Sequence, residues 1–401
     1  FPGMPDHDWT LLVQDVDKWD PEVRALTSYF NFLPRWRMDD VMISFAATGG
    51  SVGAHVDQYD VFLLQAHGQR RWQIDASEST KGKRPSLEFR PDVELKLLKK
   101  FKATHDWVLG PGDMLYLPPN VPHNGVAVNP CLTFSFGMRA PSSAELISDY
   151  LDDLVADADE SIRFQDPDLK LPEDPNEIDA AAMKRVVAAL NALRMNDPDR
   201  LGNWFGRFIT TYRAAGDILP SQAPPSPEEV QAELENGGVL ERHPWARLAW
   251  RRATRGASLY CSGLAFQLSI KDAQALAGAE QIDIGLFNKL SNKGRDALME
   301  LIIGGHYQLL DVDTIAAMLA EQDALEVLED AEEADFDEDF DDEADAPEVE
   351  IEVIEYSEAG DGEPSSASIE TVMVNEEGVE VVVICDDGEE EDEDDAETPS
   401  A

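Results

Sequence analysis

The first 140 residues alternate apolar and polar positions in short runs that Gly and Pro interrupt. Four such runs are "DVMISFAATGG", "YDVFLLQAHGQRRWQI", "WVLGPGDMLYLPP" and "CLTFSFGMRAP". Runs of this length with a period of two indicate β-strands, and the turn residues between them separate one strand from the next. Several short strands at this spacing predict a small barrel or sandwich.

From Pro141 onward the apolar positions follow the helical period instead. Ser142 and Glu145 have the spacing of a capping box, which marks a helix start. Two apolar stripes follow, one of Met183, Val187, Leu190 and Arg194 and one of Trp204, Phe208 and Tyr212. Both predict amphipathic helices. We expect these helices to fold back on the β-domain or to pair with a second copy of the chain.

A Pro-rich segment over residues 220–229, "PSQAPPSPEE", reads as a linker. Ser226 then precedes Pro227, an order that is typical of a helix start. Short strand patterns follow in "RLAWRRATR", "SLYCSG" and "LAFQLS", and a further helical pattern in "KGRDALMELIIGG". Helix, strands and helix in this order predict a winged-helix-like module.

Charge is distributed very unevenly over the 401 residues, whose formal net charge is -49. Residues 321–401 hold 36 acidic residues and no Lys or Arg, which leaves 45 acidic against 32 basic residues in the first 320. Like charges repel, so we expect the acidic blocks of this tail to be mostly disordered. A marginal hairpin with its turn at Asn375–Gly378 is the alternative for its apolar stretches.

Cysteine usage and hydropathy restrict the compartment. The three cysteines, Cys131, Cys261 and Cys385, are far apart and form no CxxC motif, which fits a reducing cytosol better than a disulfide framework. No apolar run approaches the roughly 20 residues of a membrane span. We therefore expect a cytoplasmic protein. The chain opens on "FPGMPDHDWT" without an initiator Met, and we expect that N-terminal residues are missing.

Three residues carry the candidate chemistry of a metal site. His55 and Asp57 are two apart, and on a strand that spacing places both side chains on one face. An imidazole and a carboxylate are two members of the two-histidine, one-carboxylate triad that holds Fe(II). His123 follows a rigid loop, Pro118–Pro122, among apolar neighbours, which suits a third ligand. A satisfied buried histidine is the alternative.

Arg70 and Arg71 interrupt an otherwise apolar hairpin, thirteen residues or more after Asp57. Strand alternation points one of the two guanidinium groups inward and does not say which. A buried guanidinium needs an anionic partner. The distal carboxylate of a dicarboxylate co-substrate such as 2-oxoglutarate would meet that need. Ser44 on an earlier strand, and Thr133 or Ser135 on a later one, are candidate hydrogen-bond donors to the same carboxylate.

These stretches resemble the bacterial ribosomal oxygenases of the JmjC type. The resemblance rests on "MISFAATGGSVGAHVDQYDVFLLQAHGQRRWQI", "PGDMLYLPPNVPHNGVAVNPCLTFSFGMRAP" and "WFGRFITTYR", and it covers roughly residues 1–312. It implies that His55, Asp57 and His123 bind catalytic Fe(II), that Arg70 binds 2-oxoglutarate with Ser44 as a second contact, and that O2 is consumed. The implied reaction hydroxylates the β-carbon of an arginine in a protein of the large (50S) ribosomal subunit. Eukaryotic relatives have Lys where Arg70 stands and hydroxylate histidines, so Arg70 favours the arginine branch.

The resemblance also implies the architecture, an α+β fold with a double-stranded β-helix barrel of the JmjC or cupin-like type. We expect the JmjC barrel over residues 1–140, a helical dimerisation region over 141–219, a winged-helix-like domain over 220–312 and the acidic tail over 313–401. The expected partners are a basic ribosomal protein and a second copy of the chain, with no membrane. The tail is expected to speed the encounter with a basic substrate.

Other functions remain open at this stage. A JmjC histidine hydroxylase, a lysine demethylase or a metal cupin that does not use 2-oxoglutarate would keep the barrel and change the reaction. A non-catalytic acidic protein that binds basic clients would use the tail alone. The arginines Arg242, Arg247, Arg251, Arg252 and Arg255 suggest nucleic-acid binding, but the acidic body favours a solvated strand face.

Overall fold

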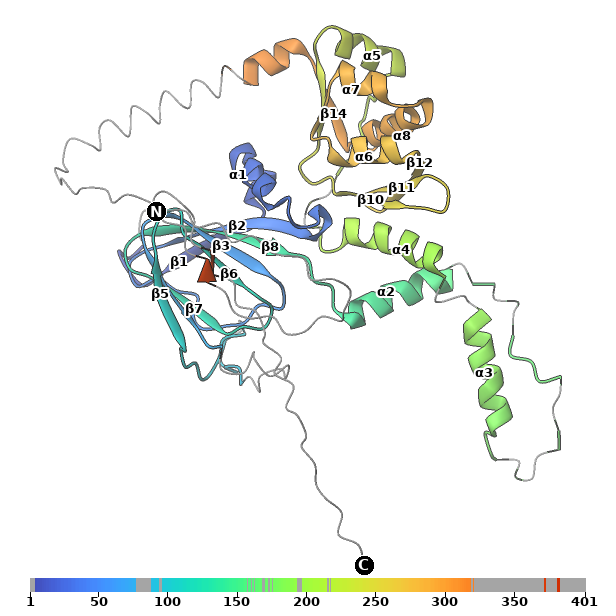
Figure 1. The fold of residues 1–401 in the computed structure, drawn as a ribbon, viewed down its shortest axis with the longest axis horizontal. Helices are drawn as coiled ribbons and strands as arrows, with labels where there is room; N and C mark the ends of the chain where they lie inside the picture. The colour runs from blue at the N-terminus through green and yellow to red at the C-terminus, as the bar shows by residue number, and fades with distance from the viewer. Residues whose placement is uncertain are drawn as a thin grey trace, which may run out of the picture. The chain divides into compact units, whose positions relative to one another are not determined.

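The computed structural model describes residues 4–320 except 77–87, 94–95, 157, 160, 162, 168–169, 172–173, 175, 193–196, 215, 217 and 319, together with residues 371–372 and 381–382. The chain divides into two compact units (Figure 1). The first comprises residues 1–140 and 342–401, and the second comprises residues 141–341.

The first unit is built from two mainly antiparallel β-sheets. Its strands are β1 (Thr10–Val13), β2 (Met38–Ala46), β3 (Val61–His67), β4 (Arg70–Ile74), β5 (His105–Leu109), β6 (Met114–Leu117), β7 (His123–Ala127) and β8 (Cys131–Met138). The larger sheet has the order β1-β2-β8-β3-β6-β16-β15, in which β15 (Thr371–Val372) and β16 (Val381–Val382) come from the tail, and the smaller sheet has the order β5-β4-β7. Chain neighbours β3 and β4 belong to different sheets, so the chain passes back and forth between them, as a barrel requires.

An apolar core joins the two sheets. Val61 and Leu115 from the larger sheet pack with Trp72, Ile74 and Leu109 from the smaller one. These residues alternate along their strands with outward-facing ones, which confirms the period of two read from the sequence. The barrel interior therefore lies between the sheets, and most side chains on this face are buried.

The outer face of the larger sheet has a cover of its own. It is formed by η1 (Val16–Lys18), α1 (Pro21–Leu26), η2 (Thr27–Phe30) and η3 (Arg35–Arg37). Phe30 packs on Phe62 and Phe136, with ring centroids 5.2 and 4.4 Å away. Asp20 caps α1 by accepting hydrogen bonds from the backbone of Glu22 and Val23. Both faces of the larger sheet are thus protected.

The second unit begins with helices α2 (Ser143–Ala156), α3 (Ala180–Ala192) and α4 (Pro198–Thr211). The predicted capping box is present, because Ser142 Oγ accepts from the Glu145 N–H at 3.2 Å and Glu145 Oε2 accepts from the Ser142 N–H at 2.8 Å. Tyr150 of α2 packs on Trp204 of α4 at 4.7 Å. The Trp204 stripe is buried as predicted, whereas Met183 of α3 is half exposed, and Arg194 lies outside the described residues.

The rest of this unit surrounds a large apolar core. Its elements are α5 (Pro227–Glu235), β9 (Val239–Arg242), β10 (Leu248–Arg252), β11 (Ala257–Cys261), β12 (Leu264–Leu268), α6 (Ile270–Gly278), β13 (Gln281–Ile282), α7 (Ile284–Lys289), α8 (Asn292–Ile303) and β14 (Tyr307–Leu310). They form two three-stranded sheets, β10-β11-β12 and β13-β9-β14. The predicted helix after Ser226, the three strands and α8 are confirmed. The sequence reading missed β9, β13 and β14.

Little of the acidic tail belongs to the described residues. The strands β15 (Thr371–Val372) and β16 (Val381–Val382) pair antiparallel, and β16 runs parallel to β6. The expected turn at 375–378 and the acidic blocks lie outside the described residues. In the described part of the chain, every helix is too short or too polar to cross a lipid bilayer.

Candidate metal and carboxylate site

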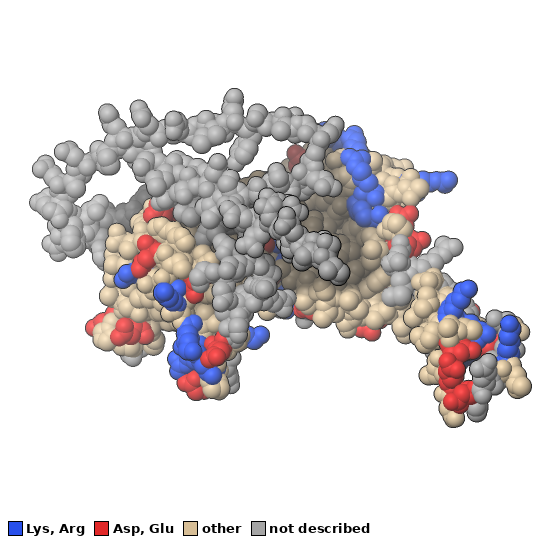
Figure 2. Space-filling view, turned by 60° about the horizontal axis from the view of Figure 1, so that its bottom comes forward, with Lys and Arg blue, Asp and Glu red and all other residues tan. Residues whose placement is uncertain are grey.

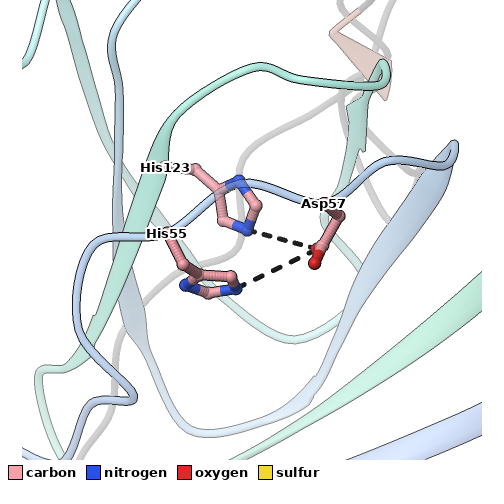
Figure 3. Close-up of side chains that lie close together, drawn as sticks. All are labelled: His55, Asp57 and His123. Atoms are coloured by element: carbon pink, nitrogen blue, oxygen red, sulfur yellow. Dashed lines mark ion pairs between the residues drawn. The ribbon is translucent and has the colours of Figure 1, made fainter. Parts of the chain in front are cut away.

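Three side chains converge at one end of the barrel (Figure 3). The Oδ2 of Asp57 lies 3.9 Å from His55 Nε2 and 3.6 Å from His123 Nε2. One potential ligand atom from each residue lies within 4.8 Å of the others. The structure thus brings together the three residues that the sequence proposed.

The route to this cluster differs from the one expected. Neither His55 nor Asp57 lies in a strand, so the argument from strand alternation was wrong. His55 instead forms an isolated bridge with His123, whose two N–H···O hydrogen bonds are both 3.0 Å long. Asp57 is fixed separately, because its carbonyl accepts from the Asn120 N–H at 2.7 Å. A loop pinned to β7 therefore does what a strand was expected to do.

Backbone carbonyls set the orientation of both imidazoles. Nδ1 of His55 lies 2.8 Å from the Gly53 carbonyl, and Nδ1 of His123 lies 2.9 Å from the Val121 carbonyl. A carbonyl only accepts, so each Nδ1 carries the proton and each Nε2 presents its lone pair to the cluster. Burial, with the nearby His55, lowers the pKa of His123 to about 4 although Asp57 opposes the shift. The His123 imidazole is therefore uncharged at neutral pH, and its Nε2 lone pair is available to a metal ion.

The arginine question is settled by the strand β4. Arg70 is only 3% exposed, whereas Arg71 faces outward and forms a two-pronged ion pair with Asp106, at 2.7 Å from Nε and 2.5 Å from Nη2. Trp72 is near both groups, because its ring centroid lies 5.0 Å from the Arg70 guanidinium carbon and 6.0 Å from the His123 ring centroid. Arg70 is thus the inward-pointing arginine, on the same interior face as His123.

Neutral groups surround the Arg70 guanidinium. Its Nη1 lies 3.0 Å from Ser44 Oγ and 3.5 Å from Thr133 Oγ1, and its Nη2 lies 3.4 Å from the Gly125 carbonyl. Its Nε is buried without a hydrogen-bond partner. Among the residues that the structure describes, no carboxylate pairs with Arg70. Burial lowers the pKa of Arg70, because the charged guanidinium has lost its contact with water.

The hydroxyl candidates are not equivalent. Ser44 and Thr133 are direct cross-strand neighbours and both contact Arg70. Ser135 lies two residues further along β8 on the same interior face and forms no hydrogen bond with Arg70. Gln65, which the sequence reading missed, is fully buried and accepts from Thr133 Oγ1 at 2.9 Å. Its polar character in the apolar run "VFLLQ" was the available signal.

Asp40 is a second residue that the sequence reading missed. A β-bulge between Met38 and Val41 precedes the regular pairing of β2 with β8. The carboxylate of Asp40 and the ring of Tyr59 lie over Gly137, since a Cβ placed there would be 3.3 Å from Asp40 Oδ1 and 3.9 Å from Tyr59 Cε2. Gly137 pairs with the interior residue Val61. Burial raises the pKa of Asp40 to about 6, although a hydrogen bond from the Asp15 N–H opposes the shift.

Comparisons with known proteins agree with this geometry. The family model of the JmjC domain matches residues 25–146, and that of the ROXA-like winged helix matches residues 192–308. The chain is 37% identical over 264 residues to the ribosomal protein uL16 3-hydroxylase of Escherichia coli, covering 66% of this chain and 68% of that protein. It is 32% identical over 316 residues to a Haemophilus influenzae protein described as a "probable ribosomal oxygenase", covering 74% of each.

A solved structure extends the match to three dimensions. The ribosomal oxygenase YcfD from Escherichia coli, in complex with cobalt and 2-oxoglutarate, superposes with a TM-score of 0.66 at 32% identity and covers 77% of this chain and 80% of its own. The predicted α+β fold class, a JmjC barrel followed by a winged helix, is confirmed. The chain belongs to the JmjC-domain ribosomal oxygenases.

Proposed function

We propose that this chain hydroxylates the β-carbon of an arginine in the large-subunit ribosomal protein uL16. Fe(II) is the metal, and 2-oxoglutarate and O2 are the co-substrates. The protein substrate is the one that the E. coli relative's name states, and 2-oxoglutarate is the compound bound in the relative's structure. In the balanced reaction, one oxygen atom enters the substrate C–H bond and the other enters succinate, with release of CO2.

The buried, unpaired guanidinium of Arg70 is the observation that carries this proposal. A metal cluster alone is common to many cupin-like proteins. A cationic side chain at 3% exposure, held only by neutral groups among the described residues, favours an anion supplied by a ligand. A dicarboxylate that reaches from the cluster past Trp72 to Arg70 would bind the metal ion at one end and supply an anion to Arg70 at the other. The Trp72 ring centroid lies 6.0 Å from the His123 ring centroid and 5.0 Å from the Arg70 guanidinium carbon. These short distances support a path along Trp72.

The three cluster residues fit Fe(II). Two neutral imidazoles and one carboxylate are the donor set of the facial triad of oxygenases, which leaves positions for co-substrate and O2. The backbone hydrogen bonds at both Nδ1 atoms fix the tautomer that such a site needs. Bound Fe(II) supplies activation of O2 toward an unactivated C–H bond. The chain's own residues hold the ion, orient the dicarboxylate through Arg70, Ser44 and Thr133, and exclude water with Trp72.

Asp40 supports arginine as the target residue. Its carboxylate lies on the interior face beside Tyr59, with no ion-pair partner among the described residues. A guanidinium is the cation that a carboxylate binds through two parallel hydrogen bonds, and an aromatic ring adds a stacking surface. A bound arginine would stabilise the carboxylate form of Asp40 and offset the effect of its burial. We therefore assign Asp40 to recognition of the substrate side chain.

The activity test uses the full chain with Fe(II), 2-oxoglutarate and recombinant uL16. Mass spectrometry of tryptic peptides should show the gain of one oxygen atom on an arginine, together with succinate formation. Oxygen on a histidine, or loss of a methyl group from a modified lysine, would replace the proposed reaction by one of the alternatives. Asp40→Asn should raise the KM for uL16 while 2-oxoglutarate binding, measured by titration calorimetry, stays unchanged.

We infer that the second copy of the chain binds through α2 and α3. On α2, Ile147, Leu151 and Val155 recur every four residues and are 59%, 40% and 68% exposed. On α3, four apolar side chains, Met183, Val186, Val187 and Leu190, are likewise exposed. Apolar stripes of this kind are typical of an interface. Sedimentation equilibrium should show a dimer that Leu151→Arg converts to a monomer, and a monomeric wild-type chain would refute the inference.

A further inference from the structure

The second unit contains a polar groove that the proposed reaction does not use. Helix α4 and the turn between β10 and β11 enclose about 500 Å³, lined among others by Asp199, Arg200, Arg251 and Arg255. Three guanidinium groups and one carboxylate line this space, which leaves an excess of positive charge. The first 320 residues hold 45 acidic against 32 basic residues, so such an excess is unusual for this chain.

The carboxylate in the groove already has a partner on each oxygen. Asp199 Oδ1 lies 3.2 Å from Arg251 Nη2, and Asp199 Oδ2 accepts from Thr254 Oγ1 at 2.9 Å. Arg251 Nε is buried without a hydrogen-bond partner. Arg255 is exposed and forms no ion pair with any described residue. Arg255 therefore keeps its donors for an anion that enters from solvent.

The chain itself is one source of anionic groups. Residues 329–345, "EDAEEADFDEDFDDEAD", contain twelve carboxylates, two phenylalanines and no basic residue. The chain from residue 320 to residue 345 can span at most roughly 85 Å, which exceeds the diameter of a domain of this size. A tethered segment has an effective concentration on the order of millimolar, which a free ligand rarely reaches.

We propose that the groove binds the acidic segment 329–345 of this chain. The carboxylates pair with the exposed Arg255, and the repulsion of the acidic body disfavours other sites for the same segment. The proposal does not depend on the reaction at the barrel. It gives the winged-helix unit a defined task, which is to hold part of the acidic tail.

A nucleic-acid phosphate is the competing anion, and the surface favours it less. Figure 2 shows Lys and Arg beside Asp and Glu in small groups on the described part of the face that it presents, without a continuous basic surface. A nucleic acid binds through many phosphates at once and needs such a surface. One exposed guanidinium, that of Arg255, beside the half-buried Arg200 and Arg251 suits a short acidic peptide segment.

The test places a photo-crosslinker in the acidic segment of the full-length chain. Phe340 is replaced by p-benzoyl-phenylalanine, and crosslinked peptides are mapped by mass spectrometry after irradiation in low salt. The expected crosslinks join residue 340 to residues 199–203 or 251–258, and they disappear at high salt because the attraction is screened. Crosslinks confined to other parts of the chain would refute the proposal.

Arg255→Gln and Arg252→Gln form a matched pair for this test. Both remove one positive charge from adjacent parts of one hairpin, but Arg252 lies outside the groove, with its guanidinium 5.6 Å from the Trp250 ring. Loss of an exposed ion pair should lower the crosslink yield about threefold in Arg255→Gln, while Arg252→Gln stays close to wild type. Equal yields in the two variants would overturn the assignment. A single-stranded RNA that binds in a salt-sensitive manner, requires Arg255 and leaves the crosslink unchanged would also overturn the assignment. Such an RNA would occupy the groove without displacing the acidic segment.

Discussion

The barrel and the winged-helix unit each bury a charged side chain, and they hold it in different ways. In the second unit, Asp272 is 2% exposed and accepts hydrogen bonds from the hydroxyls of Ser269 and Ser291, the residues that cap α6 and α8. In the barrel, Arg70 is 3% exposed, its hydrogen-bond partners among the described residues are neutral acceptors, and its Nε has no partner. The charge of Asp272 is held by helix caps of its own unit, whereas Arg70 leaves room for an anion. This difference favours the barrel interior as the place where a ligand binds.

The largest effect is expected from the metal cluster. Asp57→Ala removes the one anionic ligand from two neutral imidazoles, which should lower 2-oxoglutarate turnover by roughly a thousandfold or more. Measurement is by succinate formation at saturating Fe(II). Asp106→Ala, which loses a surface carboxylate of the same unit, should retain activity. If Asp57→Ala keeps substantial turnover, the cluster is not the metal site.

A substitution that creates a cavity in the core of the second unit should lower the stability of the protein and leave the reaction unchanged. Leu298 is fully buried in the apolar core of this unit, so Leu298→Ala should lower the free energy of unfolding by about 2–5 kcal/mol. Thermal unfolding measures the loss, and the co-substrate affinity of the folded enzyme should equal that of the wild type. A large change in co-substrate affinity would show that the two units do not separate function from stability in this way.

Arg70 and Arg71 test the contrast within one strand. Arg70→Gln should weaken 2-oxoglutarate binding about a hundredfold, because a buried charge-assisted pair is lost. Arg71→Gln removes a surface ion pair and should change binding less than about twofold. Titration calorimetry with Mn(II) in place of Fe(II) separates binding from turnover. Similar affinities in the two variants would contradict the assignment of Arg70.

The Arg70 assignment also shows what the sequence contained. Alternation alone gives two choices, but Trp72 and Ile74 are the apolar residues of "RRWQI", and Arg70 shares their face by a period of two. The sequence therefore already indicated that Arg70, and not Arg71, points inward. The same holds for the three short strands around Gly256 and Gly263, since both glycines adopt positive φ at turns, 75° and 85°.

Other features of the fold and the site could not be predicted from the sequence, for physical reasons. The position of Asp40 depends on a β-bulge, which shifts the register by one residue without a distinctive sequence. The strands β9 and β13 have four and two residues, too few to show a period. The loop that carries His55 and Asp57 is held by hydrogen bonds to His123, a contact far along the chain. Pairings over such separations come from the tertiary fold.

Acidification should lower the free energy of unfolding through the buried, uncharged His123. This effect should be smaller than those above. Between pH 6.5 and pH 4 the unfolded chain binds a proton at His123 that the folded chain does not, since burial lowers the folded pKa to about 4. Unfolding therefore becomes easier as the pH falls from 6.5, and the loss stops below about pH 4. In metal-free protein, going from pH 6.5 to pH 5.5 should cost about 1 kcal/mol through this group. Chemical denaturation of wild type and His123→Gln at both pH values isolates the contribution, and an equal loss in the two proteins would show that His123 does not cause it.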